Sequence, residues 1–154
     1  MNRLKMAAAA GACTLLGSGV AAVTQAAPAL AASCYNTSCT GKNPIDMGCA
    51  VDASTPAYIL TFGVSVEVDL RYSAACHAYW AKVIDYGIKV PGELEVIGRV
   101  CSDPEILPVR CHAAIHESSG YDASGSSAFT LMIPGDYWAR ACFSGDGSTW
   151  ECTP

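Results

Sequence analysis

The 154-residue sequence has little charge and no excess of basic residues. Only 15% of its residues are charged and 51% are hydrophobic. This composition excludes an intrinsically disordered chain, because such chains are rich in charge and poor in apolar side chains. The net charge is -5, whereas proteins that coat DNA or RNA are normally basic. We therefore expect no nucleic-acid partner.

Several motifs of catalysis and metal binding are also missing. The sequence has no G-x-S-x-G nucleophile elbow, no C-x-x-C pair and no HEXXH signature between His112 and His116. On a strand these two histidines would lie about 13 Å apart, too far to bind one ion. Glu93 and Glu95 form a carboxylate pair on the polar side of a predicted strand, where solvation is their ordinary role. We predict no enzymatic activity, no metal and no cofactor.

The first 31 residues have the composition of a secretory signal peptide. Arg3 and Lys5 are followed by an uncharged stretch without Phe, Trp or Tyr, and Ala29-Leu30-Ala31 fits the small-residue cleavage rule. We expect a signal peptide over 1–31 and a single exported domain over 32–154.

Two alternatives to a freely secreted chain depend on the same segment. The apolar leader is long enough to stay as an uncleaved membrane anchor, but it is only weakly hydrophobic and it has a good cleavage site. We therefore expect the leader to be cleaved and no stable anchor to remain. The segment from Leu30 to Cys34 loosely resembles a lipobox, which leaves lipidation of Cys34 as an alternative to its pairing in a disulfide.

The chain has an unusual number of cysteines for its length. Nine are present, and removing Cys13 with the leader leaves eight. An even number in a short exported chain predicts four disulfides, although spacing alone does not fix the pairing. Two pairs bracket turn-rich segments and are expected to be local bridges, and the other four cysteines are expected to tie the N-terminal segment to the body. The eight are Cys34, Cys39, Cys49, Cys76, Cys101, Cys111, Cys142 and Cys152, of which Cys101/Cys111 and Cys142/Cys152 are the local pairs.

Apolar and polar residues alternate with a period of two through most of the exported part. This pattern is typical of half-buried strands, and no convincing 12-residue amphipathic helix is present. We predict an all-β fold, a small antiparallel sandwich or barrel stapled by disulfides, with an irregular N-terminal segment over 33–55 and a polar loop over 118–127. The strands are expected near 57–62, 64–71, 79–85, 93–100, 129–133, 137–143 and 149–152.

Several segments together resemble a known family. They are Cys34-x4-Cys39-Thr40-Gly41-Lys42-Asn43-Pro44-x3-Gly48-Cys49, Leu70-Arg71-Tyr72-Ser73-x2-Cys76-x3-Trp80-Ala81, Ala139-Arg140-Ala141-Cys142 and Cys152-Thr153. This combination resembles the domain of unknown function 2690 family of exported actinobacterial proteins. The resemblance implies an extracytoplasmic domain without an assigned activity. It provides no catalytic residues, and the chain departs from the family in its longer middle, which contains Cys101 and Cys111.

The aromatic residues favour a binding role outside the cell. Trp138 and Trp150 flank the last predicted hairpin and are the best candidates for contact with a ligand. The expected partner is an unidentified extracellular protein or cell-wall glycan. A second hypothesis is a protease inhibitor, with Ile106 and Leu107 at the tip of a stiff loop between Cys101 and Cys111. An unrecognised hydrolase is a third.

Two polar residues within the family segments receive structural interpretations. Arg71 shares the polar face of its strand with Glu67 and Asp69, and we expect it to be a partner of these carboxylates. His77 is expected to be a local packing or surface residue rather than a general base.

Overall fold

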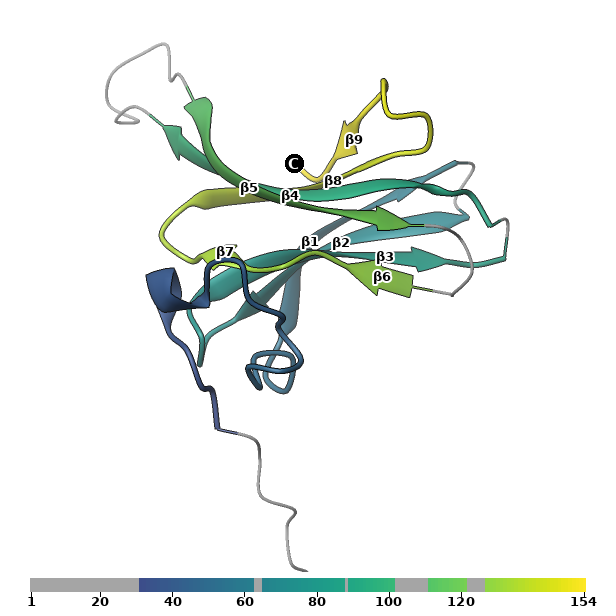
Figure 1. The fold of residues 1–154 in the computed structure, drawn as a ribbon. Coiled ribbons are helices and arrows are strands. Elements are labelled where there is room, and N and C mark those ends of the chain that lie inside the picture. Colours follow the sequence, from purple (N-terminus) through teal and green to yellow (C-terminus); the bar gives the residue numbers. More distant parts are fainter. Residues whose placement is uncertain (1–30, 63–64, 88, 102–110, 122–126) are drawn as a thin grey trace, which may run out of the picture.

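Two antiparallel β-sheets lie face to face across a shared apolar core (Figure 1). A computed structural model describes residues 31–62, 65–87, 89–101, 111–121 and 127–154, with the backbone alone at 111 and 112. The predicted all-β fold is confirmed. No helix in these ranges is long and apolar enough to cross a membrane.

The first sheet has the order β1-β2-β3-β6, with β7 also paired to β3, and comprises β1 (Ser54–Thr61), β2 (Val66–Ser73), β3 (Ala78–Asp85), β6 (Ser127–Phe129) and β7 (Ile133–Pro134). The second has the order β5-β4-β8-β9 and comprises β5 (Cys111–Tyr121), β4 (Gly92–Cys101), β8 (Trp138–Ser144) and β9 (Glu151–Cys152).

The core follows directly from the alternation in the sequence. Val66, Val68 and Leu70 project from one face of β2, and Leu94 and Val96 project from the facing side of β4. Successive side chains of a strand point to opposite faces, so the polar residues between them lie on the outer surfaces of the two sheets. The remaining buried members of this core are Ala81, Val83, Tyr121, Ile133, Ala141 and Phe143.

Part of the segment that the sequence predicted as a polar loop is a strand. Ser118, Ser119 and Gly120 belong to β5, where they stand opposite residues 93–95 of β4. The strand is continued by Tyr121, whose side chain is buried in the core. Polar side chains are compatible with an edge strand that faces solvent on one side, which explains why composition alone favoured a loop here. Residues 122–126 lie outside the described ranges.

The predicted strand over 129–133 is interrupted. Residues 130–132 separate β6 from β7, and Thr130 replaces ladder bonds with its own contacts to Ala81. The Thr130 amide donates to the Ala81 carbonyl at 3.0 Å, and the Ala81 amide donates to Thr130 Oγ1 at 3.1 Å. The break turns Met132 away from the central core and into a second cluster.

This second cluster fixes the N-terminal coil to the outer side of the first sheet, below it in Figure 1. The coil contains one short 3-10 helix, η1 (Asn36–Cys39). Disulfides join Cys34 to Cys39 and Cys49 to Cys76, and these sulfurs pack with Trp80. Of these two bridges, Cys49–Cys76 is the one that cross-links the coil to the turn between β2 and β3.

Of the two predicted local bridges, Cys142–Cys152 is confirmed. It joins β8 to β9, where the two residues stand directly opposite each other. Cys101 is disulfide-bonded, and Cys111 is its partner in the register of β4 and β5. The side chain of Cys111 lies outside the described part of the structure.

A chain of hydrogen bonds connects η1, at the start of the coil, to the first sheet. Tyr72 Oη and His77 Nδ1 are 2.8 Å apart, and His77 Nε2 is 2.9 Å from Asp136 Oδ1. The Asn36 amide donates to the other carboxylate oxygen of Asp136. Gly135 permits this approach, because a Cβ there would lie 2.7 Å from the His77 carbonyl oxygen. The local, structural interpretation of His77 agrees with these contacts.

Candidate functional site

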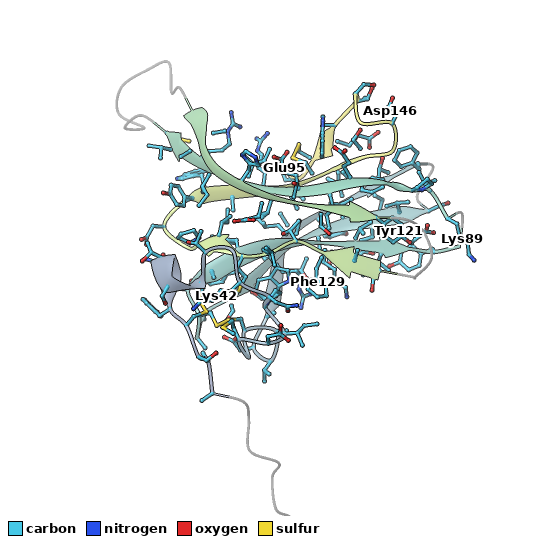
Figure 2. The ribbon with its side chains drawn as sticks, in the orientation of Figure 1. Lys42, Lys89, Glu95, Tyr121, Phe129 and Asp146 are labelled. Atoms are coloured by element: carbon cyan, nitrogen blue, oxygen red, sulfur yellow. A yellow bond between two sulfur atoms is a disulfide. The ribbon has the colours of Figure 1, made fainter. Side chains whose placement is uncertain are left out.

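The outer face of the second sheet is the polar surface that the alternation of β4 creates. Because Leu94 and Val96 are in the core, Glu93, Glu95 and Arg99 project from the opposite side. Figure 2 shows Glu95 on the side of this sheet that faces away from the core. The two ends of this surface differ in charge, and a cavity lies at each end.

One end of the surface combines an aromatic ring with two guanidinium groups. Trp138 is 75% exposed and stands opposite Arg99 in the register of β8 and β4. Arg140 follows two residues later on the same face of β8, and it makes no ion pair with any described residue. A cavity of about 170 Å³ lies here, lined by Arg99, Cys101, Trp138, Ala139, Arg140 and Pro154.

The middle of the surface joins this basic end to an acidic one. Arg140 stands opposite Ile97, which in turn stands opposite His116. Burial raises the pKa of Glu95, and Glu93 raises it further, whereas His116 acts in the opposite direction. The charge therefore changes sign along the length of β4.

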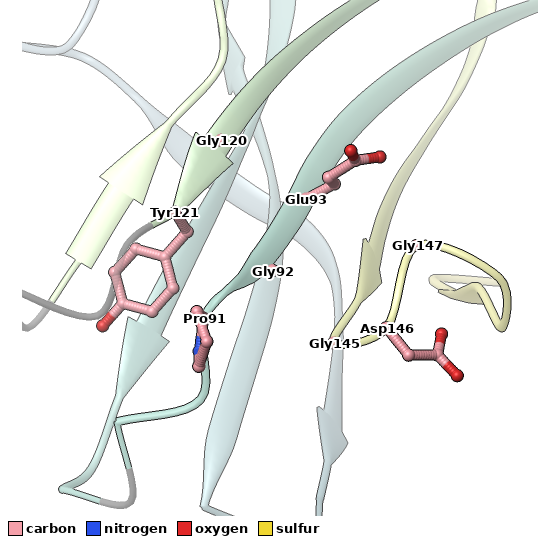
Figure 3. A pocket seen from close by; sticks show the side chains of 8 residues that line it. All are labelled: Pro91, Gly92, Glu93, Gly120, Tyr121, Gly145, Asp146 and Gly147. Atoms are coloured by element: carbon pink, nitrogen blue, oxygen red, sulfur yellow. The ribbon is translucent and has the colours of Figure 1, made fainter.

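The opposite end of the sheet holds a larger, acidic cavity of about 640 Å³. Figure 3 shows Glu93 and Tyr121 near the ends of β4 and β5, with the turn over 145–147 beside them. Hydrogen bonds from the amides of Ser148 and Thr149 hold the pKa of Asp146 well below its usual range, so this carboxylate maintains the turn. No basic side chain is among the described residues that line the cavity, which makes it unfavourable for an anion.

Comparison with known proteins identifies the family. A family model described as "Protein of unknown function (DUF2690)" matches residues 37–133. The chain belongs to the DUF2690 family. The resemblance seen in the sequence is thereby confirmed. No curated protein and no solved structure matches the chain. The matched range of this DUF2690 protein includes the whole of β1 to β6 and ends before Trp138 and Arg140.

Of the four residues that the sequence suggested for binding, the structure describes Trp138 and Trp150. Trp138 is exposed at the basic end of the second sheet. Trp150 is 37% exposed, precedes β9, and is not among the described residues that line the cavity beside Trp138. Ile106 and Leu107 lie outside the described residues, so the inhibitor loop stays a prediction.

Sequence reasoning missed the two arginines beside Trp138. Arg99 lies within the strand predicted near 93–100, and Arg140 lies within a segment that resembles the family, but neither was suggested for binding. Trp138 and Arg140 already have the i, i+2 spacing that places them on one face of a strand. The position of Arg99 beside them depends on the register between β4 and β8, which one sequence does not specify.

A pair of carboxyl groups lies on the outer face of the first sheet of this DUF2690 domain. Asp69 is only 3% exposed, and its Oδ1 has no hydrogen-bond partner among the described residues. Arg71 Nη1 lies 3.8 Å from Asp69 Oδ2, as the sequence predicted, and Lys82 stands opposite Asp69 on β3. Tyr86 Oη donates to Glu67 Oε2 at 2.6 Å.

These contacts favour a protonated form of Asp69. Burial and the neighbouring Glu67 carboxyl raise the pKa of Asp69 to about 6, against the opposing charges of Arg71 and Lys82. A proton on Asp69 removes the repulsion between the two carboxylates and the cost of a buried negative charge. The pair therefore holds one proton more readily than two separate surface carboxyls.

We predict that Asp69→Asn stabilises the protein at neutral pH but not in acid. The folded-state pKa of about 6 exceeds the ordinary value of 3.8, so the contribution of Asp69 to stability is full below pH 3.8 and is lost as the pH rises through about 6. Asparagine mimics the protonated carboxyl at every pH. The shift spans about two pKa units and each corresponds to about 1.4 kcal/mol, so the gain in the free energy of unfolding at pH 7.5 is on the order of 3 kcal/mol. Urea denaturation of both proteins between pH 3.5 and 7.5 measures this difference.

The exposed carboxylate Asp46 provides the matched control. Asp46→Asn should leave the free energy of unfolding unchanged relative to the parent protein across the same pH range, because Asp46 is exposed. A difference between Asp69→Asn and the parent that stays flat with pH would show that folding does not change the pKa of Asp69, contrary to the prediction.

Proposed function

We propose that this DUF2690 protein is a secreted, non-enzymatic binding domain of the cell envelope, and that it binds an acidic glycan through Trp138, Arg99 and Arg140. The observation that carries this proposal is the 75% exposure of Trp138 beside two guanidinium groups. A tryptophan is seldom left so exposed without a partner, because its ring has a large apolar surface.

The chemistry of the three side chains suits a sugar ring that bears a carboxylate or phosphate. The indole face of Trp138 can pack against the apolar face of a ring, while the indole N–H stays available for a hydrogen bond. Guanidinium groups bind carboxylate and phosphate oxygens in a bidentate geometry, which adds specificity as well as attraction. Arg99 and Arg140 stand on neighbouring strands and line the same cavity as Trp138, which is the arrangement expected for joint binding of one anionic group.

The charge gradient of the sheet supports the same choice of ligand and gives it a direction. Glu93 and Glu95 lie at the far end of β4 and repel an anion there. An acidic ligand is therefore expected to lie with its negative groups over Arg99 and Arg140. Electrostatic complementarity of this kind mainly determines specificity and the rate of association, and it weakens as the salt concentration rises.

The disulfides support a location outside the cytoplasm. Three complete bridges are described, and such bonds persist in oxidising compartments but are rare where thiols are kept reduced. Secretion with cleavage of the leader before Ala32 forms part of the same proposal.

Binding to purified bacterial cell walls tests the function. The oxidised domain over 32–154 should sediment with cell walls, and Trp138→Ala should weaken the affinity at least tenfold, because a central aromatic anchor typically contributes about 2 kcal/mol or more. Raising the salt concentration should weaken binding of the parent protein. A neutral polysaccharide such as dextran should not compete, whereas a polyanionic glycan should.

Tyr58→Ala is the matched control for the loss of an exposed aromatic ring. Tyr58 is 60% exposed, but it lies on the outer face of the first sheet. Equal affinities of the Trp138→Ala variant and the parent, or equal losses in both variants, would overturn the proposed site. A parent protein that binds neither cell walls nor the polyanionic glycan would overturn the proposed function.

A further inference from the structure

Four buried sulfur atoms meet where the N-terminal coil joins the first sheet. The Sγ atoms of Cys34, Cys39, Cys49 and Cys76 all lie within 4.8 Å of one another. Cys34 Sγ and Cys49 Sγ, which belong to different disulfides, are 3.8 Å apart. The two disulfides are therefore in contact with each other, and the four cysteines form a single cluster.

The cluster has the donor set and the dimensions of a tetrahedral zinc site. Zinc in structural sites is bound by four ligands, and four thiolates are among the commonest sets, with Zn–S distances of about 2.3 Å. A regular tetrahedron with bonds of that length has sulfur atoms about 3.8 Å apart. The separation between Cys34 and Cys49 already has this value, and no pair in the cluster exceeds 4.8 Å.

We propose that the same four cysteines form a zinc site when the chain is reduced, so that the junction between coil and sheet can be held either by two disulfides or by one Zn²⁺ ion. This inference goes beyond the proposed function and does not depend on it, since the cluster lies on the other sheet. The sequence predicted no metal site, because the spacing contains no C-x-x-C pair. The fold supplies the proximity that the spacing lacks.

The conversion balances in two steps. Each disulfide reacts with one phosphine and one water molecule: the S–S bond breaks, two thiols form, and the phosphine is oxidised to its oxide. The two disulfides thus yield four thiols. One Zn²⁺ then displaces four protons as four Zn–S bonds form, because the thiolate and not the thiol is the ligand.

Burial of the cluster couples metal binding to folding. Cys39, Cys49 and Cys76 are inaccessible to solvent, and Trp80 packs against them at 3% exposure. Reduction without metal breaks the Cys49–Cys76 bridge, which is the described disulfide that joins the coil to the sheet. A zinc ion would restore a cross-link at the same place. The fluorescence of Trp80 therefore reports whether the coil is docked.

The experiment uses Co²⁺ as a spectroscopic probe for the zinc site. The domain with Trp138→Phe and Trp150→Phe retains Trp80 as its single tryptophan. It is reduced with a water-soluble phosphine without oxygen and titrated with Co²⁺, and Zn²⁺ is then added. We expect one equivalent of Co²⁺ to give the visible bands of tetrahedral thiolate coordination and Zn²⁺ to bleach them. With Zn²⁺ bound, the emission of Trp80 should return to the shorter wavelength of the oxidised protein.

Two cysteine variants in this background locate the site. Cys142→Ser with Cys152→Ser removes a bridge of the second sheet and should leave the cobalt spectrum and its one-to-one stoichiometry unchanged. Cys34→Ser with Cys39→Ser keeps the Cys49–Cys76 bridge in the oxidised state, so it can fold, but should lose the tetrathiolate spectrum after reduction. The proposal is overturned by absence of the spectrum in the reduced parent, by its persistence without Cys34 and Cys39, or by Trp80 emission that does not respond to Zn²⁺.

Discussion

Replacing both Cys49 and Cys76 by alanine should lower the free energy of unfolding by about 3–4 kcal/mol. The two residues are 27 positions apart, and a cross-link that closes a loop of this length restricts the unfolded chain by about that amount in the chain-entropy model. The same change releases the coil from the sheet, so it exposes Trp80 and removes packing as well. Guanidinium denaturation followed by circular dichroism measures the loss, and Trp80 emission measures the release.

The neighbouring bridge provides the comparison. Cys34 and Cys39 are only 5 residues apart, so alanine at both positions should cost about 2 kcal/mol. Both bridges are buried in one cluster, and the difference between the two double variants therefore isolates the effect of loop length. Equal losses, or a larger loss for Cys34 and Cys39, would contradict the assignment of Cys49–Cys76 as the main link.

Phe143→Ala should destabilise the sandwich by about 3–5 kcal/mol, the largest effect expected of any single substitution here. The Phe143 side chain is fully buried between the sheets and is the largest side chain in the core that is inaccessible to solvent. Its ring makes edge contacts with Phe62 and Tyr121 at centroid distances of 5.8 and 6.4 Å. Truncation removes this apolar surface from the core and leaves a cavity that the surrounding strands fill only in part.

Phe62 is the matched control for the loss of an aromatic ring. It contacts Phe143 but is 42% exposed at the end of β1. Phe62→Ala should therefore cost less than half as much as Phe143→Ala in the same denaturation experiment, because less apolar surface returns to water. Similar losses in the two variants would show that the core does not lie between the sheets as described.

The period-two pattern was sufficient to predict the all-β fold class and the inner faces of the strands, because the alternation of buried and exposed residues is a local property of each strand. Val66, Val68 and Leu70 identify the inner face of β2 without any knowledge of its neighbours. The Cys142–Cys152 bridge was predictable for a similar reason, since a single turn brings its two ends together. Ser118 to Gly120 were mistaken for a loop, because an edge strand tolerates polar residues on its outer face.

The candidate site was harder to predict from the sequence, because its residues come from different strands and meet only through the register in which these strands pair. Trp138 was identified from its residue type and its place beside a hairpin. Arg99, in contrast, reaches Trp138 only through the pairing of β4 with β8, 39 positions away in the chain. The meeting of four cysteine sulfurs likewise depends on how the coil docks, which no spacing rule describes. Contacts between distant segments are the part of the structure that a single sequence specifies least.

The indole N–H signals of the three tryptophans test the central claim most directly. In an NMR titration of the ¹⁵N-labelled oxidised domain with solubilised cell-wall glycan, the signal of Trp138 should show the largest shift or broadening, because this ring forms the proposed contact. The signal of Trp80 should stay unchanged, since its ring is buried at 3% exposure on the other sheet. Binding that leaves the Trp138 signal unperturbed, or a titration in which no signal changes, would contradict the account.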